Sequence, residues 1–433
     1  MQDMYDLLGV GCGPFNLSLA AVLDGVSPDM SEGEVKTLFF ERASEFDWHK
    51  ELMFDDSKMQ TSYLKDLVSP VDPTNPHSFM NYLVKHGLFY HFMNTARQTI
   101  SRYEFEDYCR WVISNLEKTF QFGTGVESID FLGDHFVVQT TQGEFQAKNI
   151  CVGSGPVRNI PEVARPFLGK RVFHAKSPET SQMDLTNKRL LIVGGGQTGI
   201  EVFRNSLKGK WGKAAKVDLI THRQTLQPLD EAPFTNEFFA PGFIREFLPI
   251  SQETKDDLVK QQFLSSDGNT PAYLQSLYED LYLDKYYTRR FPEYTLRPLR
   301  WMDQIEEVDD SFRIRMENRL YQSQEFIDAD VIVLATGFKT VLPPYLKNLY
   351  SRLEFDAWER PVLNPDYSLK ADFGEDNKIY AMNFGRHSHG IADPQTSLMA
   401  WRSGVIANSL LKRQHYLAEP MQNNFCQYKP IDR

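Results

Sequence analysis

Short apolar runs that lead through a glycine-rich turn into a helical apolar pattern occur twice in the chain. The first starts with residues 5–8 (YDLL), turns at 9–14 (GVGCGP) and continues as FNLSLAAVL over 15–23, where apolar positions recur at helical spacing. The second starts with residues 189–193 (RLLIV), in which four apolar residues follow Arg189, and turns at 194–199 (GGGQTG) before another helical pattern. Each segment predicts a buried strand, a tight turn and a helix.

A strand, a glycine turn and a helix are the context that a dinucleotide-binding fingerprint requires. The glycines permit a tight turn and a close approach of the pyrophosphate, and the helix N-terminus supplies N–H groups and a positive dipole. The second fingerprint is complete, whereas a proline replaces the third glycine of the first. We predict two nucleotide sites, one formed by Gly9, Gly11, Gly13 and Pro14 and the other by Gly194, Gly196, Gln197, Thr198 and Gly199.

The strand that follows each fingerprint distinguishes the two nucleotides. VKTLFFER (35–42) ends near Glu41, whose carboxylate is suited to accept hydrogen bonds from ribose hydroxyls. KVDLITHRQ (216–224) ends in His222 and Arg223 without a carboxylate, and a basic residue there accommodates a 2′-phosphate. The first site is therefore assigned to FAD and the second to NADPH. The alternative for Arg223 is a solvated surface arginine.

Two further strand-to-glycine segments indicate how the chain is divided. KNICVGSGP (148–156) stands where the chain would leave the flavin-binding unit. ADVIVLATGFKT (329–340) stands where it would return, with Thr336 and Gly337 as further cofactor-binding residues.

The predicted fold class is α/β, with two dinucleotide-binding, Rossmann-like domains and a smaller, largely helical substrate region. The FAD domain is expected to be discontinuous, with residues 1–165 plus 330–433. The NADPH domain is expected to span 166–329, and its residues 230–300, rich in aromatic and loop residues, are expected to contribute the substrate region.

The composition limits the kinds of partner that we expect the protein to bind and the cellular compartment in which we expect it. A chain of 433 residues is too long for one hydrophobic core, so two or three domains are expected. The formal net charge of −11 argues against a nucleic acid or an anionic membrane surface as the main partner. No apolar run is long enough for a transmembrane segment, and the N-terminus lacks the basic region of a secretion signal. Four widely separated cysteines are typical of reduced thiols, which predicts a cytoplasmic protein.

Two redox nucleotides imply hydride transfer from nicotinamide to flavin, and the next question is which group accepts the electrons. A disulfide reductase needs a cysteine pair, and no such motif is formed by Cys12, Cys109, Cys151 and Cys426. His387 and His389 lack partners at metal-ligand spacing, so we expect loop histidines and no metal site. Molecular oxygen is then the natural acceptor, as in a flavin monooxygenase.

Longer motifs, spread over nearly the whole chain, agree with this chemistry. They are GVGCGPFNLSLA (9–20), FDWH (46–49), MQTSYLKDLV (59–68), PTNPHSFMNYLVKH (73–86), GGGQTG (194–199), DEAPFTNEFF (230–239), ATGF (335–338) and HGIADPQTSLMAWRS (389–403). Together they resemble the flavin-dependent N-hydroxylating monooxygenases of siderophore biosynthesis, which include L-lysine N6-hydroxylases and L-ornithine N5-hydroxylases. The similarity is greatest to the lysine hydroxylases of the aerobactin type.

The resemblance implies an FAD- and NADPH-dependent monooxygenase in which a C4a-hydroperoxyflavin hydroxylates the terminal primary amine of L-lysine, for a hydroxamate siderophore. The same chemistry on L-ornithine, putrescine, cadaverine or histamine is the alternative. A flavin-linked NADPH reductase or oxidase without hydroxylation, and a nucleotide-binding regulator without catalysis, are candidates from other classes. A homo-oligomeric state, such as a tetramer, is left open.

Lys65 lies in an otherwise apolar stretch, KMQTSYLKDLVSP (58–70), and an ammonium that loses water needs an anionic partner. Asp66 cannot face the same way in an extended segment. The resemblance implies that Lys65 binds the α-carboxylate of the substrate, which favours an amino acid over a diamine. The alternatives are a lysine whose ammonium reaches solvent and a local pair with Asp66.

The resemblance also implies roles for other residues. Gln60 is expected beside the reactive edge of the flavin, Trp48 and His49 near the isoalloxazine, Asn236 at substrate and nicotinamide, and Ser397 and Leu398 in a loop over the substrate. Asn236 follows the pattern of ornithine enzymes, whereas SSDGNTP (265–271) follows that of lysine enzymes. The two features point to different chain lengths, so lysine is preferred over ornithine without being established.

Overall fold

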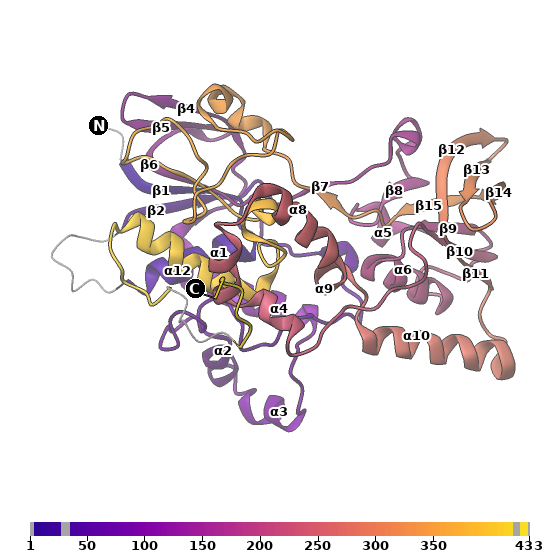
Figure 1. The fold of residues 1–433 in the computed structure, drawn as a ribbon. Coiled ribbons are helices and arrows are strands. Elements are labelled where there is room, and N and C mark those ends of the chain that lie inside the picture. Colours follow the sequence, from indigo (N-terminus) through magenta and orange to yellow (C-terminus); the bar gives the residue numbers. More distant parts are fainter. Residues whose placement is uncertain (1–3, 27–34, 419–424, 432–433) are drawn as a thin grey trace.

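Two sheets, one mixed and one parallel, organise the computed structural model, which describes residues 4–26, 35–418 and 425–431. Each sheet contains one of the two predicted strand–turn–helix units, and the sheets lie in separate lobes (Figure 1). The fold class predicted from the sequence is therefore confirmed.

The first sheet has the order β3-β2-β1-β6-β5-β4, with β17 paired to β6. Its parallel strands are β1 (Met4–Val10), β2 (Thr37–Phe40), β3 (Phe120–Gln121), β6 (Gly143–Val152) and β17 (Ile379–Ala381). The antiparallel strands β4 (Val126–Leu132) and β5 (His135–Thr140) extend it on the far side of β6.

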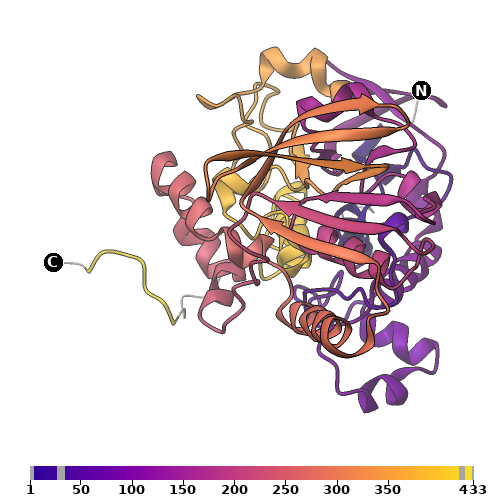
Figure 2. The same cartoon turned by 90° about the vertical axis from the view of Figure 1, so that its right-hand side faces the viewer.

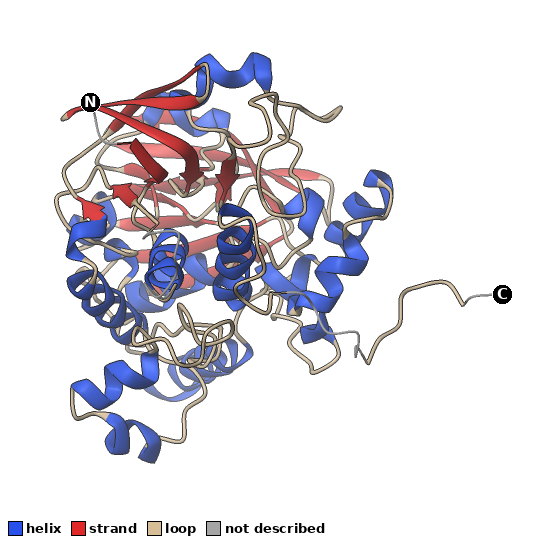
Figure 3. Cartoon of the chain, turned by 90° about the vertical axis from the view of Figure 1, so that its left-hand side faces the viewer, coloured by secondary structure: helices blue, strands red, loops and turns tan. Residues whose placement is uncertain are grey.

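Helices from both ends of the chain cover the first sheet. Helix α1 (Pro14–Asp24) packs on α12 (Met399–Leu410), and α4 (Arg102–Asn115) packs on α1. Ser101 and Glu104 form a capping box that defines where α4 begins. Two short helices, α2 (Phe79–Lys85) and α3 (Phe89–Asn94), lie beside α4. Figure 3 shows most helices of the molecule gathered below the strands.

The second sheet is parallel, with the order β11-β10-β9-β15-β8. Its strands are β8 (Val172–His174), β9 (Arg189–Val193), β10 (Lys216–Thr221), β11 (Glu293–Pro298) and β15 (Val331–Leu334), and α6 (Gln197–Leu207) follows β9. A separate antiparallel sheet that the sequence did not predict packs on it (Figure 2); its strands are β12 (Arg300–Val308), β13 (Ser311–Asn318) and β14 (Ser323–Ala329).

Two short paired strands carry the chain from the first sheet to the second and back. Strand β7 (Val157–Arg158), on the outgoing path, pairs antiparallel with β16 (Phe338–Lys339), on the returning path. The expected boundary at residue 330 is wrong by several residues, because β15 pairs with β9 and β8 and so belongs to the second sheet. After β16 the chain returns to the first sheet, where it adds β17 (Figure 1).

A helical region connects β10 with the rest of the second lobe. Its helices are α7 (Pro241–Phe247), α8 (Gln252–Gln261), α9 (Phe263–Asp267) and α10 (Pro271–Leu283), and both α7 and α8 contact α11 (Arg386–His389). The expected substrate region of 230–300 is largely helical, but its last residues form strand β11 instead. The remaining short helix, α5 (Glu179–Gln182), follows β8.

Within the described ranges, no helix has both the length and the apolar character to cross a membrane.

Candidate functional site

The first glycine turn has the shape of a nucleotide cradle. Gly11 has a φ of +94°, and a Cβ built on it would lie 2.6 Å from the carbonyl oxygen of Gly153 on the neighbouring strand exit. Gly13 caps α1 without any side-chain hydrogen bond, and Pro14 occupies the first turn of the helix. The free N–H groups of this helix terminus therefore remain available to a pyrophosphate, as FAD requires.

Two side chains hold the first turn from either side. Glu41, just after β2, accepts a hydrogen bond from the backbone N–H of Cys12 and another from that of Ala43, each at 2.9 Å. The buried side chain of Asn16 donates to the carbonyl oxygens of Val10 and Gly11, at 3.1 and 2.8 Å. Glu41 thus lies at the turn where the sequence placed it. Asn16 was missed, because a polar residue in an apolar helix gives no sign of its partner.

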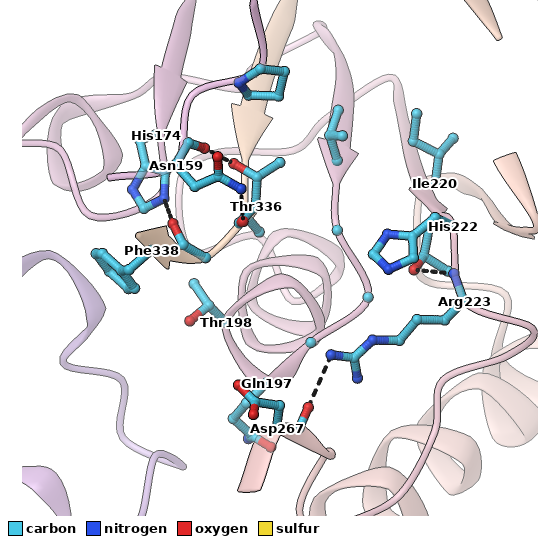
Figure 4. Close-up of a pocket in the computed structure, with 18 of the residues that line it drawn as sticks. Asn159, His174, Gln197, Thr198, Ile220, His222, Arg223, Asp267, Thr336 and Phe338 are labelled. Atoms are coloured by element: carbon cyan, nitrogen blue, oxygen red, sulfur yellow. Dashed lines mark hydrogen bonds between the residues drawn. The ribbon is translucent and has the colours of Figure 1, made fainter. Parts of the chain in front are cut away.

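The second glycine turn forms the wall of a cavity of about 710 Å³ between the lobes (Figure 4). Among the residues predicted for the second nucleotide, those that line this cavity are Gly194, Gly196, Gln197, Thr198, Arg223, Thr336 and Gly337. Gly199 lies behind them, and a Cβ on it would collide with the carbonyl oxygen of Gly194. Helix α6 begins after Gly196 without a side-chain cap, as helix α1 does after Gly13.

Arg223 reaches into this cavity from the end of β10 (Figure 4). Its Nη2 donates to the carbonyl oxygen of Asp267 at 3.0 Å, and its buried Nη1 has no hydrogen-bond partner. Burial lowers the pKa of the guanidinium, and nearby Asp267 opposes this shift. An arginine always remains charged in proteins, so Arg223 offers an unsatisfied donor and a positive charge to a phosphate.

Other residues of the cavity were not predicted. Trp301 lines it, with the ring of His222 on one side at 5.0 Å and the guanidinium of Arg319 at 3.7 Å from its centre. Arg386 also lines it, but its Nη2 is paired with Asp267 at 2.6 Å. These residues come from β12 and α11, far from the fingerprint in sequence, so no local pattern could identify them.

The loop 59–66 separates the large cavity from a small one. Gln60 lines the large cavity, whereas its neighbours Met59 and Thr61 line the small one together with Lys65. Opposite orientation of adjacent side chains is the geometry of an extended segment. One loop therefore presents a residue to each of the two cavities.

The side chain of Lys65 has no ion pair or hydrogen bond within the part of the chain that the structure describes. The side chain is exposed by surface area rather than half-buried as expected, yet partial loss of water lowers the pKa of its ammonium. The proposed local pair with Asp66 is absent, because the buried Asp66 carboxylate accepts from the backbone N–H groups of Val68, Ser69 and Phe79 and from the Ser69 hydroxyl.

The segment 396–398 closes the small cavity on one side. The Thr396 hydroxyl lies 3.0 Å from that of Thr61 and lines the cavity. Ser397 has a buried Oγ without a partner, and Leu398 is buried in the apolar core. The orphaned hydroxyl is consistent with a ligand at this segment.

Of the residues expected at the flavin and the substrate, Trp48, His49 and Asn236 are among those that line neither cavity. Trp48 packs edge-to-face on Phe105, with ring centres 4.9 Å apart. His49 has a φ of +58°, and burial, with lesser effects from nearby Lys176 and Arg102, lowers its pKa well below the usual range. Asn236 is exposed on the short 3-10 helix Thr235–Phe239. Their assigned roles remain proposals.

The histidines at 387 and 389 have structural contacts. The Nε2 of His387 lies 3.0 Å from the carbonyl oxygen of Pro361, and the buried ring of His389 stacks on Tyr367 with centres 4.2 Å apart. Over the described ranges, no cluster of His, Cys, Asp and Glu side chains could hold a metal ion.

The segment 265–271 forms hydrogen bonds with the second glycine turn and does not lie beside Lys65 in the small cavity. The buried Asn269 donates from Nδ2 to the carbonyl oxygens of Gly195 and Gln227, both at 3.0 Å. The next residue, Thr270, donates its backbone N–H to Gln197 Oε1 at 2.9 Å. This motif, which pointed to lysine enzymes, therefore lies at the large cavity beside the second glycine turn.

Comparisons with known proteins agree with this geometry. A family described as L-lysine 6-monooxygenase/L-ornithine 5-monooxygenase matches residues 3–340. L-lysine N6-monooxygenase of Escherichia coli is 38% identical over 415 residues, which cover 95% of this chain and 96% of that protein. Putrescine N-hydroxylase of Acinetobacter baumannii is 28% identical over 428 residues, 96% of this chain and 92% of that protein. The solved structure of an ornithine N-hydroxylase of Kutzneria sp. 744, with reduced FAD, NADP⁺ and L-ornithine, is 26% identical, superposes with a TM-score of 0.86 and covers 95% of this chain and 99% of its own.

Proposed function

The chain belongs to the L-lysine 6-monooxygenase/L-ornithine 5-monooxygenase family, and from this we propose that it N-hydroxylates the terminal amine of L-lysine with FAD, NADPH and O₂. FAD supplies oxygen activation and NADPH supplies the hydride when both are bound. The residues of the chain bind and orient these groups and keep water away from them.

The observation that carries the proposal is the loop 59–66, which lies between the two cavities. Gln60 faces the cavity of the second glycine turn, and Lys65 faces the small cavity without a partner of its own. A substrate held by Lys65 is thus one loop away from the cavity assigned to NADPH. This short separation suits a reaction in which FAD has to be within reach of both NADPH and the amine of the substrate.

Lys65 favours an amino acid over a diamine. A carboxylate at its ammonium forms a charge-assisted hydrogen bond, which neither cadaverine nor putrescine can offer. The nearby hydroxyl of Ser397 has no partner and can contribute a further hydrogen bond to a ligand. Lysine is preferred over ornithine because the lysine enzyme of Escherichia coli is 38% identical over 95% of this chain.

Arg223 supports NADPH as the reductant. Its side chain lines the large cavity beside the second glycine turn, where a 2′-phosphate would sit, its buried Nη1 has no hydrogen-bond partner, and no acidic residue ends β10. The product, an N-hydroxylated lysine, is a precursor from which acylation makes a hydroxamate, so we assign the enzyme to siderophore biosynthesis.

Two further assignments of the sequence stay proposals. A homo-oligomer, such as a tetramer, could use exposed aromatic side chains near the end of α10 for contacts between subunits. These side chains are Tyr278, Tyr282, Tyr286 and Tyr287. A cytoplasmic location rests on the cysteine pattern, and Cys12, Cys109 and Cys151 are free and buried.

A panel of amines tests the proposed function. Hydroxylated product is measured with NADPH and FAD on lysine, ornithine, cadaverine, putrescine and histamine. We expect the highest kcat/KM with lysine, a lower value with ornithine and little product from amines without a carboxylate. A preference for cadaverine over lysine would reassign the substrate, and NADPH oxidation without product on any amine would favour a reductase or oxidase.

A further inference from the structure

A segment of the first lobe enters the core of the second lobe. Leu52 and Phe54 are 2% and 1% exposed, and both belong to the apolar cluster that contains the strands β9 and β10. The ring of Phe54 meets that of Trp211 edge-to-face, with centres 5.7 Å apart. The two lobes are therefore packed together here and not merely joined by the crossing strands.

Glu201 lies at this junction, on the buried face of α6. Its carboxylate accepts two hydrogen bonds from Arg102 of α4, at 2.9 and 3.0 Å, and Arg102 also donates to the carbonyl oxygen of Leu52 at 2.8 Å. The side chain of Glu201 is 1% exposed and that of Arg102 is 13% exposed. A buried pair of this kind links the helix of the second fingerprint to the first lobe.

The same carboxylate begins a chain of hydrogen bonds that leads to the large cavity and to the loop 59–66. Gln197 donates from Nε2 to Glu201 at 2.9 Å, and its Oε1 accepts from the backbone N–H of Thr270 at 2.9 Å. The Thr270 hydroxyl in turn accepts from Gln60 Nε2 at 3.1 Å. Gln197 and Gln60 both line the large cavity, whereas Glu201 and Arg102 do not.

We propose that Glu201 is a positioning residue for hydride transfer, which acts through Gln197 and Gln60 and touches neither cofactor nor substrate. Its charge holds Arg102 on one side and orients the Gln197 amide on the other, so the start of α6, which lines the large cavity, is set relative to the loop 59–66. The proposal rests on the proposed function, because it concerns the transfer from NADPH to FAD. Misplacement of reacting groups by about 1 Å can cost two orders of magnitude in rate.

The test is Glu201→Gln, which keeps the shape of the side chain and removes its charge. In anaerobic stopped-flow experiments at saturating NADPH, we expect the rate of flavin reduction to fall about tenfold or more. Because the Arg223 contact is untouched, the Kd for NADPH should change far less than the rate. Under air, a smaller share of the NADPH oxidised should yield hydroxylated amine, and more should yield peroxide.

Glu106→Gln is the matched control, because it also removes the charge of a glutamate that pairs with an arginine. Glu106 and its partner Arg110, 2.8 Å apart, both lie on α4, and their ion pair does not involve Glu201. This variant should leave the rate of flavin reduction unchanged. Thr270→Val is the second variant and removes only the acceptor of Gln60, with a smaller loss of rate in the same direction expected.

A folded Glu201→Gln enzyme with the wild-type rate of flavin reduction and the wild-type yield would overturn the proposal. If Glu201→Gln does not fold, a wild-type rate in Thr270→Val overturns it instead. A slowed flavin reduction in an enzyme that hydroxylates no amine would refute the proposed function and leave the role of Glu201 standing.

Discussion

At the scale of single residues, Lys65 is the side chain whose surroundings say most about the substrate. Its neighbour Asp66 is saturated by three backbone N–H groups and a hydroxyl, so it cannot neutralise Lys65. Burial lowers the pKa of the Lys65 ammonium, and a bound carboxylate would raise it again. The ion pair that the sequence suggested as an alternative is thereby excluded. The exposed ammonium still reaches solvent, and an external carboxylate is the partner that we propose for it.

Lys65→Ala should raise the KM for lysine about 10- to 100-fold, because a hydrogen bond to a charged group contributes about 1.5–3 kcal/mol. The rate of NADPH oxidation in the absence of amine should stay close to that of the wild type. Steady-state kinetics with lysine and with cadaverine measure this. Lys58→Ala, an exposed lysine of the same segment, is the control and should change neither value. An unchanged KM for lysine would remove Lys65 from the substrate site.

Arg223→Ala should reduce the preference for NADPH over NADH about 10- to 100-fold, since it removes a charge-assisted contact to the 2′-phosphate. The ratio of kcat/KM for the two nucleotides measures this. Arg313→Ala, which breaks an exposed ion pair with Asp328 in the same lobe, serves as control. If the ratio does not move, Arg223 is a surface arginine and the assignment of the second nucleotide loses its main support.

Which residues the sequence could identify follows from how local their signal is. The fingerprint glycines, Glu41 and Arg223 stand at fixed places in a strand–turn–helix unit, and the structure puts them at the two turns. Glu201 looks like an ordinary helical glutamate until Arg102, 99 residues away, is brought to it. Its role depends on a long-range contact, which one sequence without relatives does not reveal.

At the scale of elements, the two glycine turns depend on backbone that approaches closely. Gly194 has a φ of +128°, and a Cβ on it would collide with the carbonyl oxygen of Ala335 at the end of β15. The turn after β9 therefore packs against the residue that follows β15, and the two strands are neighbours in the sheet. The sequence pattern of 329–340 showed a buried strand correctly but could not show which sheet it joins.

Gly11→Ala should lower the free energy of unfolding by about 2–4 kcal/mol, because it combines a left-handed backbone with a contact to the Gly153 carbonyl oxygen. The purified variant should also contain less FAD. Absorbance of the flavin and a urea unfolding curve measure the two effects. Gly169→Ala is the control, since a Cβ there meets nothing within 4 Å and its φ is not positive. A Gly11→Ala enzyme with full FAD content would contradict the assignment of the first turn.

At the scale of the whole molecule, the lobes share one cavity, two crossing strands and a packed junction. The sequence predicted two nucleotide units and a chain that leaves the first unit and returns to it. It did not predict the antiparallel sheet β12–β14 or the entry of Leu52 and Phe54 into the second core. The periodicity of apolar residues and the spacing of motifs predict single helices, strands and turns. Contacts between the lobes depend on the assembled fold and have no such local pattern.

The stability of the whole molecule should depend on pH through buried histidines. Burial lowers the pKa of His389 to about 3. The stability that the neutral ring contributes is fully present above pH 6.5 and is lost as the pH falls from there toward 3, because the unfolded chain binds the proton first. At pH 5 this loss amounts to about 2 kcal/mol.

Urea unfolding of wild type and His389→Gln at pH 7 and pH 5 measures this effect. The variant, although less stable at pH 7, should lose about 2 kcal/mol less than the wild type between the two pH values. His91→Gln, an exposed histidine of the first lobe, should leave the difference unchanged. Equal losses in wild type and His389→Gln would show that His389 is not kept neutral by the fold.

The yield of N6-hydroxylysine per NADPH oxidised, in FAD-loaded enzyme saturated with L-lysine and with peroxide counted in parallel, tests the central claim most directly. The account predicts nearly one hydroxylated lysine for each NADPH, with little peroxide and with the new oxygen atom derived from O₂. Rapid NADPH oxidation whose electrons all appear as peroxide, with no oxidised nitrogen on lysine or any other amine, would contradict it.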